Sequence, residues 1–117
     1  METMNEILRI VISEDFSDSP GGRHREDGDF SGEMFREDIL ENKYLEAAQN
    51  NMTLFIDLDG AFGYTTSFLD EAFGGLARKY GSAEVSRFLV FKYDDEPATV
   101  SLIEEYINSA SDNTSNN

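Results

Sequence analysis

One stretch, LFIDLDGAFGYTTSFLDEAFGGL at residues 54–76, carries most of the information about the architecture of this chain. Its apolar opening belongs to a run over residues 52–58 that is continuous rather than alternating, which is typical of a buried central strand. Asp59-Gly60 then gives a turn signal. After the hydroxyl cluster Thr65–Ser67, apolar residues recur at helical spacing over residues 68–76. The stretch therefore predicts a strand, a loop and an amphipathic helix.

The same alternation continues on both sides of this stretch. Apolar patterns and cap residues predict four further elements: a strand at residues 7–12, a helix from the Ser31 cap to Ala48 with a break near Asn42, a strand at residues 86–92 and a helix from Pro97. A loop rich in Gly, Asp and Ser separates the first two, with a turn at Asp27-Gly28. This order predicts an α/β fold with a small mixed or parallel sheet and covering helices.

The helix after the central strand has recognisable ends. We expect Ser67 to cap it, because Asp70 three positions later stands where the acid of a capping box would be. We expect Gly81 to end it. Open α/β sheets usually carry their sites at the carboxyl ends of the strands. The loop Asp59–Ser67 is therefore predicted to lie at the functional edge of the sheet.

Charge is the strongest signal in the composition. The chain has 24 acidic and 9 basic residues, which gives a net charge of −15. Direct binding to nucleic acid or to an anionic membrane is not expected, since either needs a basic surface. Such acidity is typical of a solvated surface that keeps a small protein soluble, and it also suits a surface that meets a basic partner.

Length and patterning predict one cytoplasmic domain. We expect a single domain at residues 1–108 and a polar, disordered tail at residues 109–117. The N-terminus has no signal-peptide pattern, and no apolar run approaches the length of a membrane-spanning helix. Cysteine is absent, which excludes disulfides, cysteine–metal sites and a cysteine nucleophile.

Two chemistries compete for the central loop. In the first, Asp57 and Asp59 resemble the first motif of haloacid-dehalogenase-type phosphatases, in which one aspartate is the nucleophile and the next a general acid/base beside magnesium. That motif continues with threonine where this chain has Ala61, and about half of the chain precedes it. The alternative is structural: Asp59-Gly60 forms a turn, and Asp57 accepts hydrogen bonds from loop N–H groups.

The second chemistry is phosphorylation of Thr65, Thr66 or Ser67. A serine at a helix N-terminus on an exposed loop is a favourable phosphoacceptor, because free N–H groups and the helix dipole stabilise the phosphate. Phosphorylation would add a charge of about −1.5 to −2 next to Asp70 and Glu71 and so switch off a docking surface by repulsion. Between the two chemistries, we favour the hydroxyls over the aspartates.

A strand ending in Asp57-Leu58-Asp59-Gly60, followed by hydroxyls and a helix, resembles the STAS domain of anti-sigma-factor antagonists. In those proteins a GHKL-type serine kinase phosphorylates the second serine of an Asp-Ser-Ser-Gly loop. That loop corresponds here to Thr65-Thr66-Ser67-Phe68, so the resemblance makes Ser67 the candidate phosphoacceptor. Thr65 stands in place of the leading aspartate, and Phe68 in place of the glycine.

A longer ordered set of residues resembles one bacterial family. The set is Gly22-Arg23, Asp27-Gly28, Ser31-Gly32-Glu33, Phe35-Arg36, Asp57-Leu58-Asp59-Gly60, Gly63-Tyr64, Ser67-Phe68-Leu69 and residues 71–76. It resembles a STAS-like family of unassigned function, found in bacteria and mobile elements and sometimes fused or adjacent to GHKL-type ATPases. The resemblance implies a non-catalytic regulatory domain that binds a protein partner, such as a GHKL-type kinase or ATPase, and needs no cofactor or metal.

The predicted docking surface combines the central loop, the helix after it and a small basic island. Its candidate residues are Asp59, Phe62, Tyr64, Phe68, Asp70, Glu71, Gly74, Gly75 and Arg23. If exposed rather than folded over the core, Phe30, Phe62 and Tyr64 would make a binding patch beside Ser67. Gly74-Gly75 indicates close packing of the helix on the sheet or a docking groove. The island Arg23-His24-Arg25 predicts either an anion site or pairing with acids at residues 26–33.

The net charge supports an alternative function class. An acidic decoy or inhibitor from a mobile element would bind a basic nucleic-acid-binding enzyme. A decoy complex should weaken steeply with ionic strength, whereas an apolar docked complex should not.

Overall fold

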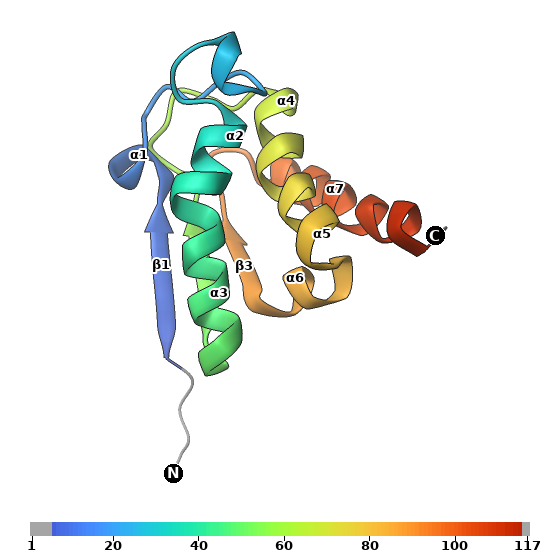
Figure 1. Cartoon of the computed structure of the whole chain (residues 1–117). Coiled ribbons are helices and arrows are strands. Elements are labelled where there is room, and N and C mark those ends of the chain that lie inside the picture. Colours follow the sequence, from blue (N-terminus) through green and yellow to red (C-terminus); the bar gives the residue numbers. More distant parts are fainter. Residues whose placement is uncertain (1–5, 116–117) are drawn as a thin grey trace.

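Three parallel strands form the centre of the structure, a computed structural model that describes residues 6–115 (Figure 1). The strands are β1 (Ile7–Val11), β2 (Thr53–Asp57) and β3 (Leu89–Lys92), hydrogen-bonded in the order β1-β2-β3. Both pairings are parallel, with Leu54 of β2 opposite Leu8 and Leu89. The predicted α/β class is confirmed, and of the two sheet types expected from the sequence the parallel one is present.

Helices connect the strands and cover one face of the sheet. The α-helices are α1 (Ile12–Asp15), α2 (Gly32–Phe35), α3 (Glu41–Asn50), α4 (Thr66–Leu69), α5 (Gly75–Tyr80), α6 (Ser82–Phe88) and α7 (Pro97–Ser115). The others are the 3-10 turn η1 (Arg25–Asp27) and the wider π-helical turns η2 (Arg36–Leu40) and η3 (Asp70–Gly74). The backbone stays right-handed helical through both π turns. Residues 32–50 and 66–80 are therefore two continuous helices, called helix 32–50 and helix 66–80 below.

Helix 32–50 begins as expected and differs in its interior. Ser31 caps it by accepting a hydrogen bond from the N–H of Met34 (3.1 Å). The predicted break near Asn42 is wrong, because this side chain is exposed and a weak helix former is tolerated there. The irregular part is instead the π turn that starts at Arg36, and the helix ends at Asn51 in the left-handed conformation.

The loop before this helix folds back onto its first turn. The N–H groups of Gly32 and Glu33 donate to the carbonyls of Gly22 and Arg23, each at 3.0 Å. These bonds satisfy donors that a helix start leaves free. The loop is thereby fixed, and the turn expected near Gly28 is the 3-10 turn η1.

Two boundaries near the C-terminus also differ from the prediction. The third strand starts at Leu89 rather than residue 86, because α6 occupies the preceding residues and buries Val85 and Phe88 at helical spacing. The predicted disordered tail from residue 109 is replaced by a continuation of α7, in which Ala110 belongs to the core. Residues 116–117 lie outside the described part of the chain.

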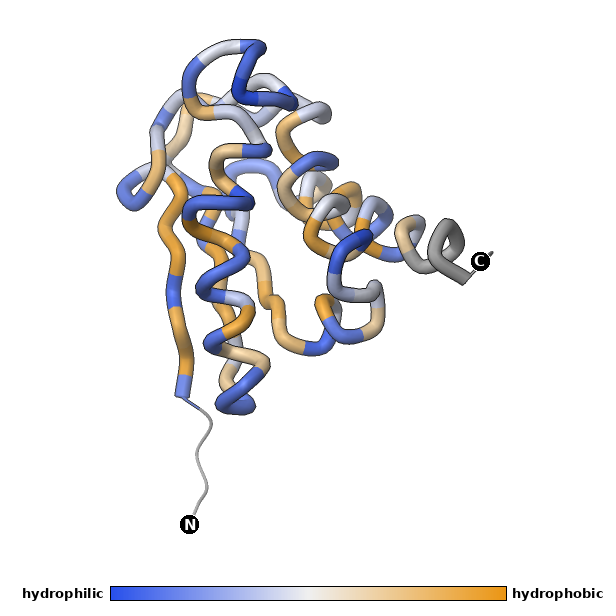
Figure 2. The backbone as a smooth tube through the Cα atoms, in the orientation of Figure 1, coloured by the Kyte–Doolittle hydropathy of each residue, from blue (hydrophilic) through white to orange (hydrophobic). Residues whose placement is uncertain are grey.

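The core lies between the sheet and the helices. Alternation along the strands turns Ile10, Leu54 and Ile56 towards the helices, where they are fully buried. Figure 2 shows the strands largely in orange and the loops at the upper edge largely in blue and pale colours. On the opposite face Arg9 is exposed and lies over the Phe55 ring, 5.0 Å from its centroid. β2 is central, as predicted, but only its alternate side chains are fully buried.

Candidate functional site

The loops that follow the three strands meet at one edge of the sheet, at the top of Figure 1. The N–H of Phe62 donates to the Asp18 carbonyl (2.8 Å), and the Ser13 hydroxyl donates to the Asp59 carbonyl (3.4 Å). The loop after β2 is thus in contact with the chain after β1, at the predicted carboxyl edge. We call this region the acidic loop edge and define it as Asp18, Asp59, Phe62, Lys92, Asp94 and Asp95.

Asp59 joins two loops of this edge. Its carboxylate accepts hydrogen bonds from Lys92 Nζ (2.6 Å) and from the backbone N–H groups of Asp94 and Asp95 (3.0 Å each). The Lys92 bond and the two backbone bonds lower the pKa of Asp59 from its ordinary 3.8 to about 2. The same contact raises the pKa of Lys92. Asp59 is therefore a charged clamp between the loops after β2 and β3.

Asp57 has a local structural role. Its Oδ1 accepts a hydrogen bond from the N–H of Asp59 at 2.9 Å. This is the structural role predicted for Asp57 as the alternative to a catalytic nucleophile. Among residues 6–115, no group of three or more His, Asp or Glu side chains is placed to hold a metal ion. Asp57 and Asp59 therefore both accept hydrogen bonds from groups at this edge of the sheet.

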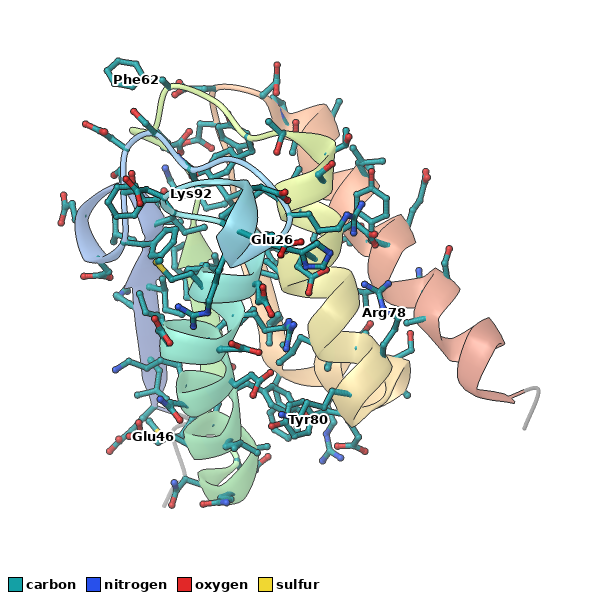
Figure 3. All side chains as sticks on the ribbon, turned by 45° about the horizontal axis from the view of Figure 1, so that its top comes forward. Glu26, Glu46, Phe62, Arg78, Tyr80 and Lys92 are labelled. Carbon is teal, nitrogen blue, oxygen red and sulfur yellow. The ribbon has the colours of Figure 1, made fainter. Side chains whose placement is uncertain are left out.

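Phe62 and Tyr64 point in opposite directions. The Phe62 side chain is 85% exposed, and Figure 3 shows it clear of the other side chains. Gly60 and Gly63 flank it with positive φ values of 96° and 155°. The Tyr64 hydroxyl instead donates to the Leu58 carbonyl (2.7 Å), and burial raises the pKa of this phenol. Of the three aromatic residues predicted as a patch, Phe62 stands free, Phe30 is 40% exposed with its ring against Phe16, and Tyr64 turns inward.

The hydroxyl cluster starts helix 66–80 two residues earlier than predicted. Thr65 is the cap, because its Oγ1 accepts a hydrogen bond from the N–H of Phe68 at 3.1 Å. The prediction of Ser67 as the cap is wrong, since Ser67 lies inside the first turn and is half-buried. Thr65 and Thr66 are exposed. Asp70 does not complete a capping box, because its carboxylate pairs with two arginines.

Glu71 of helix 66–80 faces helix 32–50, whereas Arg78 and Lys79 of the same helix stay 39% and 55% exposed. Arg36 donates from Nη2 to Glu71 Oε2 (2.8 Å), from Nη1 to Glu41 Oε2 (2.7 Å) and from Nε to the Glu71 carbonyl (3.1 Å). Lys79 also binds Glu41, at 3.0 Å. We call this interface the helix seam; its charged residues are Arg23, Arg36, Glu41, Asp70, Glu71, Arg78 and Lys79.

The seam holds three of the predicted docking residues in internal ion pairs. Arg23 binds Asp70 at 2.8 Å and lies 3.7 Å from Glu71. Burial of Asp70 opposes its ionisation, but hydrogen bonds from Arg23 and Arg78 outweigh that effect, so the pKa of Asp70 is lowered. These charges stabilise the packing of the two helices.

Phe68 and the two glycines of helix 66–80 also have internal roles. Phe68 is fully buried, with its ring packed between Phe35 and Tyr64. A Cβ on Gly75 would lie 2.8 Å from Arg36 Nε, and one on Gly74 would lie 2.6 Å from Asp70 Oδ1. The glycines therefore make room for the seam. The predicted packing of these glycines on the sheet is wrong.

The basic island is paired as well. Arg25 binds Glu37 (3.2 Å) and Asp38 (2.8 Å), and His24 lies 3.7 Å from Glu33. Pairing with acids was one of the two interpretations of the sequence, but the arginines reach beyond residues 26–33. No local pattern marks the seam residues Arg36, Glu41 and Lys79, because the pairs Arg36–Glu71 and Lys79–Glu41 join residues 35 and 38 positions apart.

With the fold and both charged regions in place, the chain can be compared with known families. Residues 31–98 match the family described as a STAS-like domain of unknown function (DUF4325). The match covers more than half of the chain. The chain belongs to this family. The matched part of the STAS-like domain contains helix 32–50, helix 66–80, β2, β3 and the loop with Phe62, while nearly all of α7 lies beyond it.

Two further comparisons returned nothing. No curated protein and no solved structure matches this STAS-like domain. Over the part of the chain that the structure describes, each helix is too short or too polar to cross a lipid bilayer.

Proposed function

We propose that this STAS-like domain is a non-catalytic regulatory module that binds a protein partner through the acidic loop edge. The observation that carries the proposal is Phe62, a large aromatic side chain that is 85% exposed on a loop held by hydrogen bonds. Covering a phenylalanine ring contributes about 2 kcal/mol to association. A fixed loop avoids part of the ordering entropy that binding otherwise requires.

The charges around Phe62 define the partner's chemistry. Asp94 and Asp95 are exposed beside the Asp59–Lys92 pair, within a chain of net charge −15. A complementary surface therefore has a pocket for one aromatic ring, surrounded by basic side chains. The family resemblance favours a GHKL-type kinase or ATPase as the protein that carries this surface.

Binding is favoured over catalysis by the roles of the two aspartates. Asp57 and Asp59 both accept hydrogen bonds within the loops, and Asp59 is paired with Lys92. A phosphatase of the haloacid-dehalogenase type would need Asp57 as a free nucleophile. Magnesium-dependent hydrolysis of an aryl phosphate that is lost in Asp57→Asn would overturn the non-catalytic assignment.

The docking test compares two exposed apolar side chains. Phe62→Ala is expected to weaken binding to the partner captured from the native host by about tenfold or more, as for an aromatic hot spot. Ile7→Ala is the matched control, because Ile7 is also exposed but lies on β1, away from the loops. Titration by calorimetry measures both. Equal affinities of Phe62→Ala and the wild type would sink the proposal.

Phosphorylation is the proposed control of this docking surface. The resemblance assigns the phosphate to Ser67, with the exposed Thr66 and the cap Thr65 as alternatives. Asp70 and Glu71 are already paired with arginines, so a phosphate at this helix start would add unpaired negative charge. That charge would face the basic partner surface proposed above, so it would strengthen docking rather than repel the partner.

The switch is tested with a pair of variants at one position. Mass spectrometry of the protein from its host locates the phosphate among the three hydroxyls. Ser67→Asp is expected to bind the partner about tenfold more tightly than Ser67→Ala, because the added negative charge faces a basic partner surface. If the two variants bind equally, Ser67 is not the switch; Thr66→Asp and Thr66→Ala then test the neighbouring hydroxyl.

A second candidate function, an acidic decoy for a basic nucleic-acid-binding enzyme, is favoured by the pattern of ion pairs. Six of the nine basic residues are paired within the described chain: Arg23, Arg25, Arg36, Arg78, Lys79 and Lys92. They leave a large excess of acid at the surface. A decoy complex would lose affinity steeply between low and high salt, whereas docking through Phe62 would change little.

A further inference from the structure

The outer edge of β3 offers main-chain groups for a fourth strand. The Lys92 carbonyl accepts a hydrogen bond from the N–H of Leu58, so the main-chain groups of Lys92 face β2. Successive residues of a strand alternate in this direction, so the N–H and C=O of Phe91 point away from β2. Within residues 6–115, no strand lies beyond β3 in the sheet. The Leu89 N–H is taken by the Val85 carbonyl, but the Leu89 carbonyl also points outward.

A groove lies directly beside this edge. It has a volume of about 240 Å³ and is bounded by β3, α6 and α7, the helix on the side of β3 away from β2 (Figure 1). Its lining residues are Ser86, Leu89, Phe91, Glu104, Ile107 and Asn108. Leu89 and Phe91 of β3 and Ile107 of α7 are its apolar lining residues, while Glu104 and Asn108 add polar groups from α7.

We infer that this groove binds an extended, basic peptide segment of a partner protein, which adds to the sheet as a strand along β3. The outward-pointing main-chain groups of Phe91 and Leu89 require the bound segment to be extended. Only a strand presents alternating N–H and C=O groups to a sheet edge. An apolar side chain of the segment packs on the half-buried Phe91. A lysine or arginine two positions along the segment, on the same face of the added strand, binds Glu104.

Charge favours such a segment over a second copy of this chain. Pairing β3 with β3 of another copy would bring two α7 helices together, each with Glu104 and Glu105 exposed. Two chains of net charge −15 also repel each other, whereas a basic segment is attracted. The groove is separate from the acidic loop edge, so this proposal does not depend on docking through Phe62.

The test uses a synthetic peptide added to the full chain, in which valine and lysine take turns at every second position with threonine between them, so that both side chains lie on one face of the strand. Two neighbouring charge reversals on α7 provide the matched comparison: Glu104 lines the groove and Glu105 does not, although both are exposed. We expect Glu104→Lys to weaken binding about tenfold and Glu105→Lys to have a much smaller effect. Both variants change the net charge equally, so general attraction to an acidic protein is controlled.

The main-chain part of the proposal has its own readout. Bound peptide should slow hydrogen exchange at the Phe91 amide, measured by NMR, because that N–H gains an acceptor. An analogue with N-methylated alternate amides keeps the side chains and loses the main-chain donors, and it should not bind.

Three results would overturn the inference. The first is an equal loss of affinity in Glu104→Lys and Glu105→Lys, which would indicate unspecific attraction. The second is unchanged exchange at Phe91 under saturating peptide, or equal binding of the N-methylated analogue. The third is protection of Phe91 without peptide that increases with protein concentration, which would identify the edge as an interface between copies.

Discussion

The helix seam and the acidic loop edge use the same kind of ion pair in different surroundings. In the seam, Arg36 and Glu71 are 2.8 Å apart, with side chains only 13% and 12% exposed. At the loop edge, Lys92 and Asp59 are 2.6 Å apart, with side chains 39% and 19% exposed. The two ion-pair distances are similar, but water reaches the Lys92–Asp59 pair more readily than the Arg36–Glu71 pair.

This difference separates structural charge from charge available for recognition. A buried ion pair that loses one partner leaves the other charge without solvation, which is strongly destabilising. An exposed pair can exchange its partner for water at little loss. We therefore expect changes in the seam to affect folding and changes at the loop edge to affect binding and pH dependence.

The largest effect is expected for Arg36→Ala. Removing this guanidinium leaves Glu41 with Lys79 and Glu71 with the more distant Arg23, and it also frees the Glu71 carbonyl. We expect the free energy of unfolding to fall by about 3 kcal/mol, the low end for breaking a buried pair. Urea denaturation followed by circular dichroism measures this change.

Arg25→Ala is the matched control for that variant. Arg25 also pairs with two acids, but its side chain is largely exposed on the loop before helix 32–50. Its denaturation midpoint should stay close to that of the wild type. Equal losses in the two variants would contradict the distinction between buried and exposed pairs.

An intermediate effect is expected where the loop edge passes into helix 66–80. Thr65→Ala removes the cap acceptor of the Phe68 N–H and should cost about 1 kcal/mol of stability. Ser67→Ala also removes a side-chain hydroxyl, but at a residue inside the first turn, two positions after the cap. It should leave the free energy of unfolding nearly unchanged. The reverse order in thermal or urea denaturation would restore Ser67 as the cap.

The smallest effect is a change in the pH dependence of stability from Asp59→Asn. The folded pKa of Asp59 is about 2, below its ordinary 3.8, so its ionised form stabilises the fold above about pH 4. This contribution decreases as the pH falls from about 4 through 2. The wild type should therefore exceed Asp59→Asn in stability at neutral pH, with a difference that shrinks on acidification.

Asp95→Asn controls for the loss of one negative charge at the same edge. Only the backbone N–H of Asp95 contacts Asp59, and this group is retained in the variant. Its pH profile should follow that of the wild type. A difference that stays constant between pH 6 and 2 in Asp59→Asn would argue against the Lys92 clamp.

The sequence predicted much of the fold because its signals are local. The apolar run of β2, the Ser31 cap, Gly81 with a φ of 102° and Pro97 at the start of α7 are each visible within a few residues. The buried face of helix 66–80 also follows its apolar spacing. The predicted strand at residues 86–92 was partly wrong, because α6 has too few residues for its helical period to be distinguished.

The sequence predicts the docking surface less well, because a charged residue in a sequence does not reveal with which residue it forms an ion pair in the folded chain. Asp70, Glu71 and Arg23 have the composition of an exposed polar surface, yet they pair with residues of other elements. Of the candidates at the loop edge, Phe62 is exposed, Asp59 is half-buried in its pair with Lys92, and Tyr64 turns inward.

The sequence by itself determined the acidity of this protein, the order of its elements, the position of the central loop at the carboxyl edge and its membership of the STAS-like family. The tertiary structure alone decided which charged side chains are held in internal ion pairs and which remain available at the surface. Arg23 meets Asp70 across 47 positions of the chain, and Arg36 meets Glu71 across 35. Such pairs depend on how helix 66–80 packs against helix 32–50 and against the loop before it, whereas caps, turns and apolar periods depend on neighbours a few residues away.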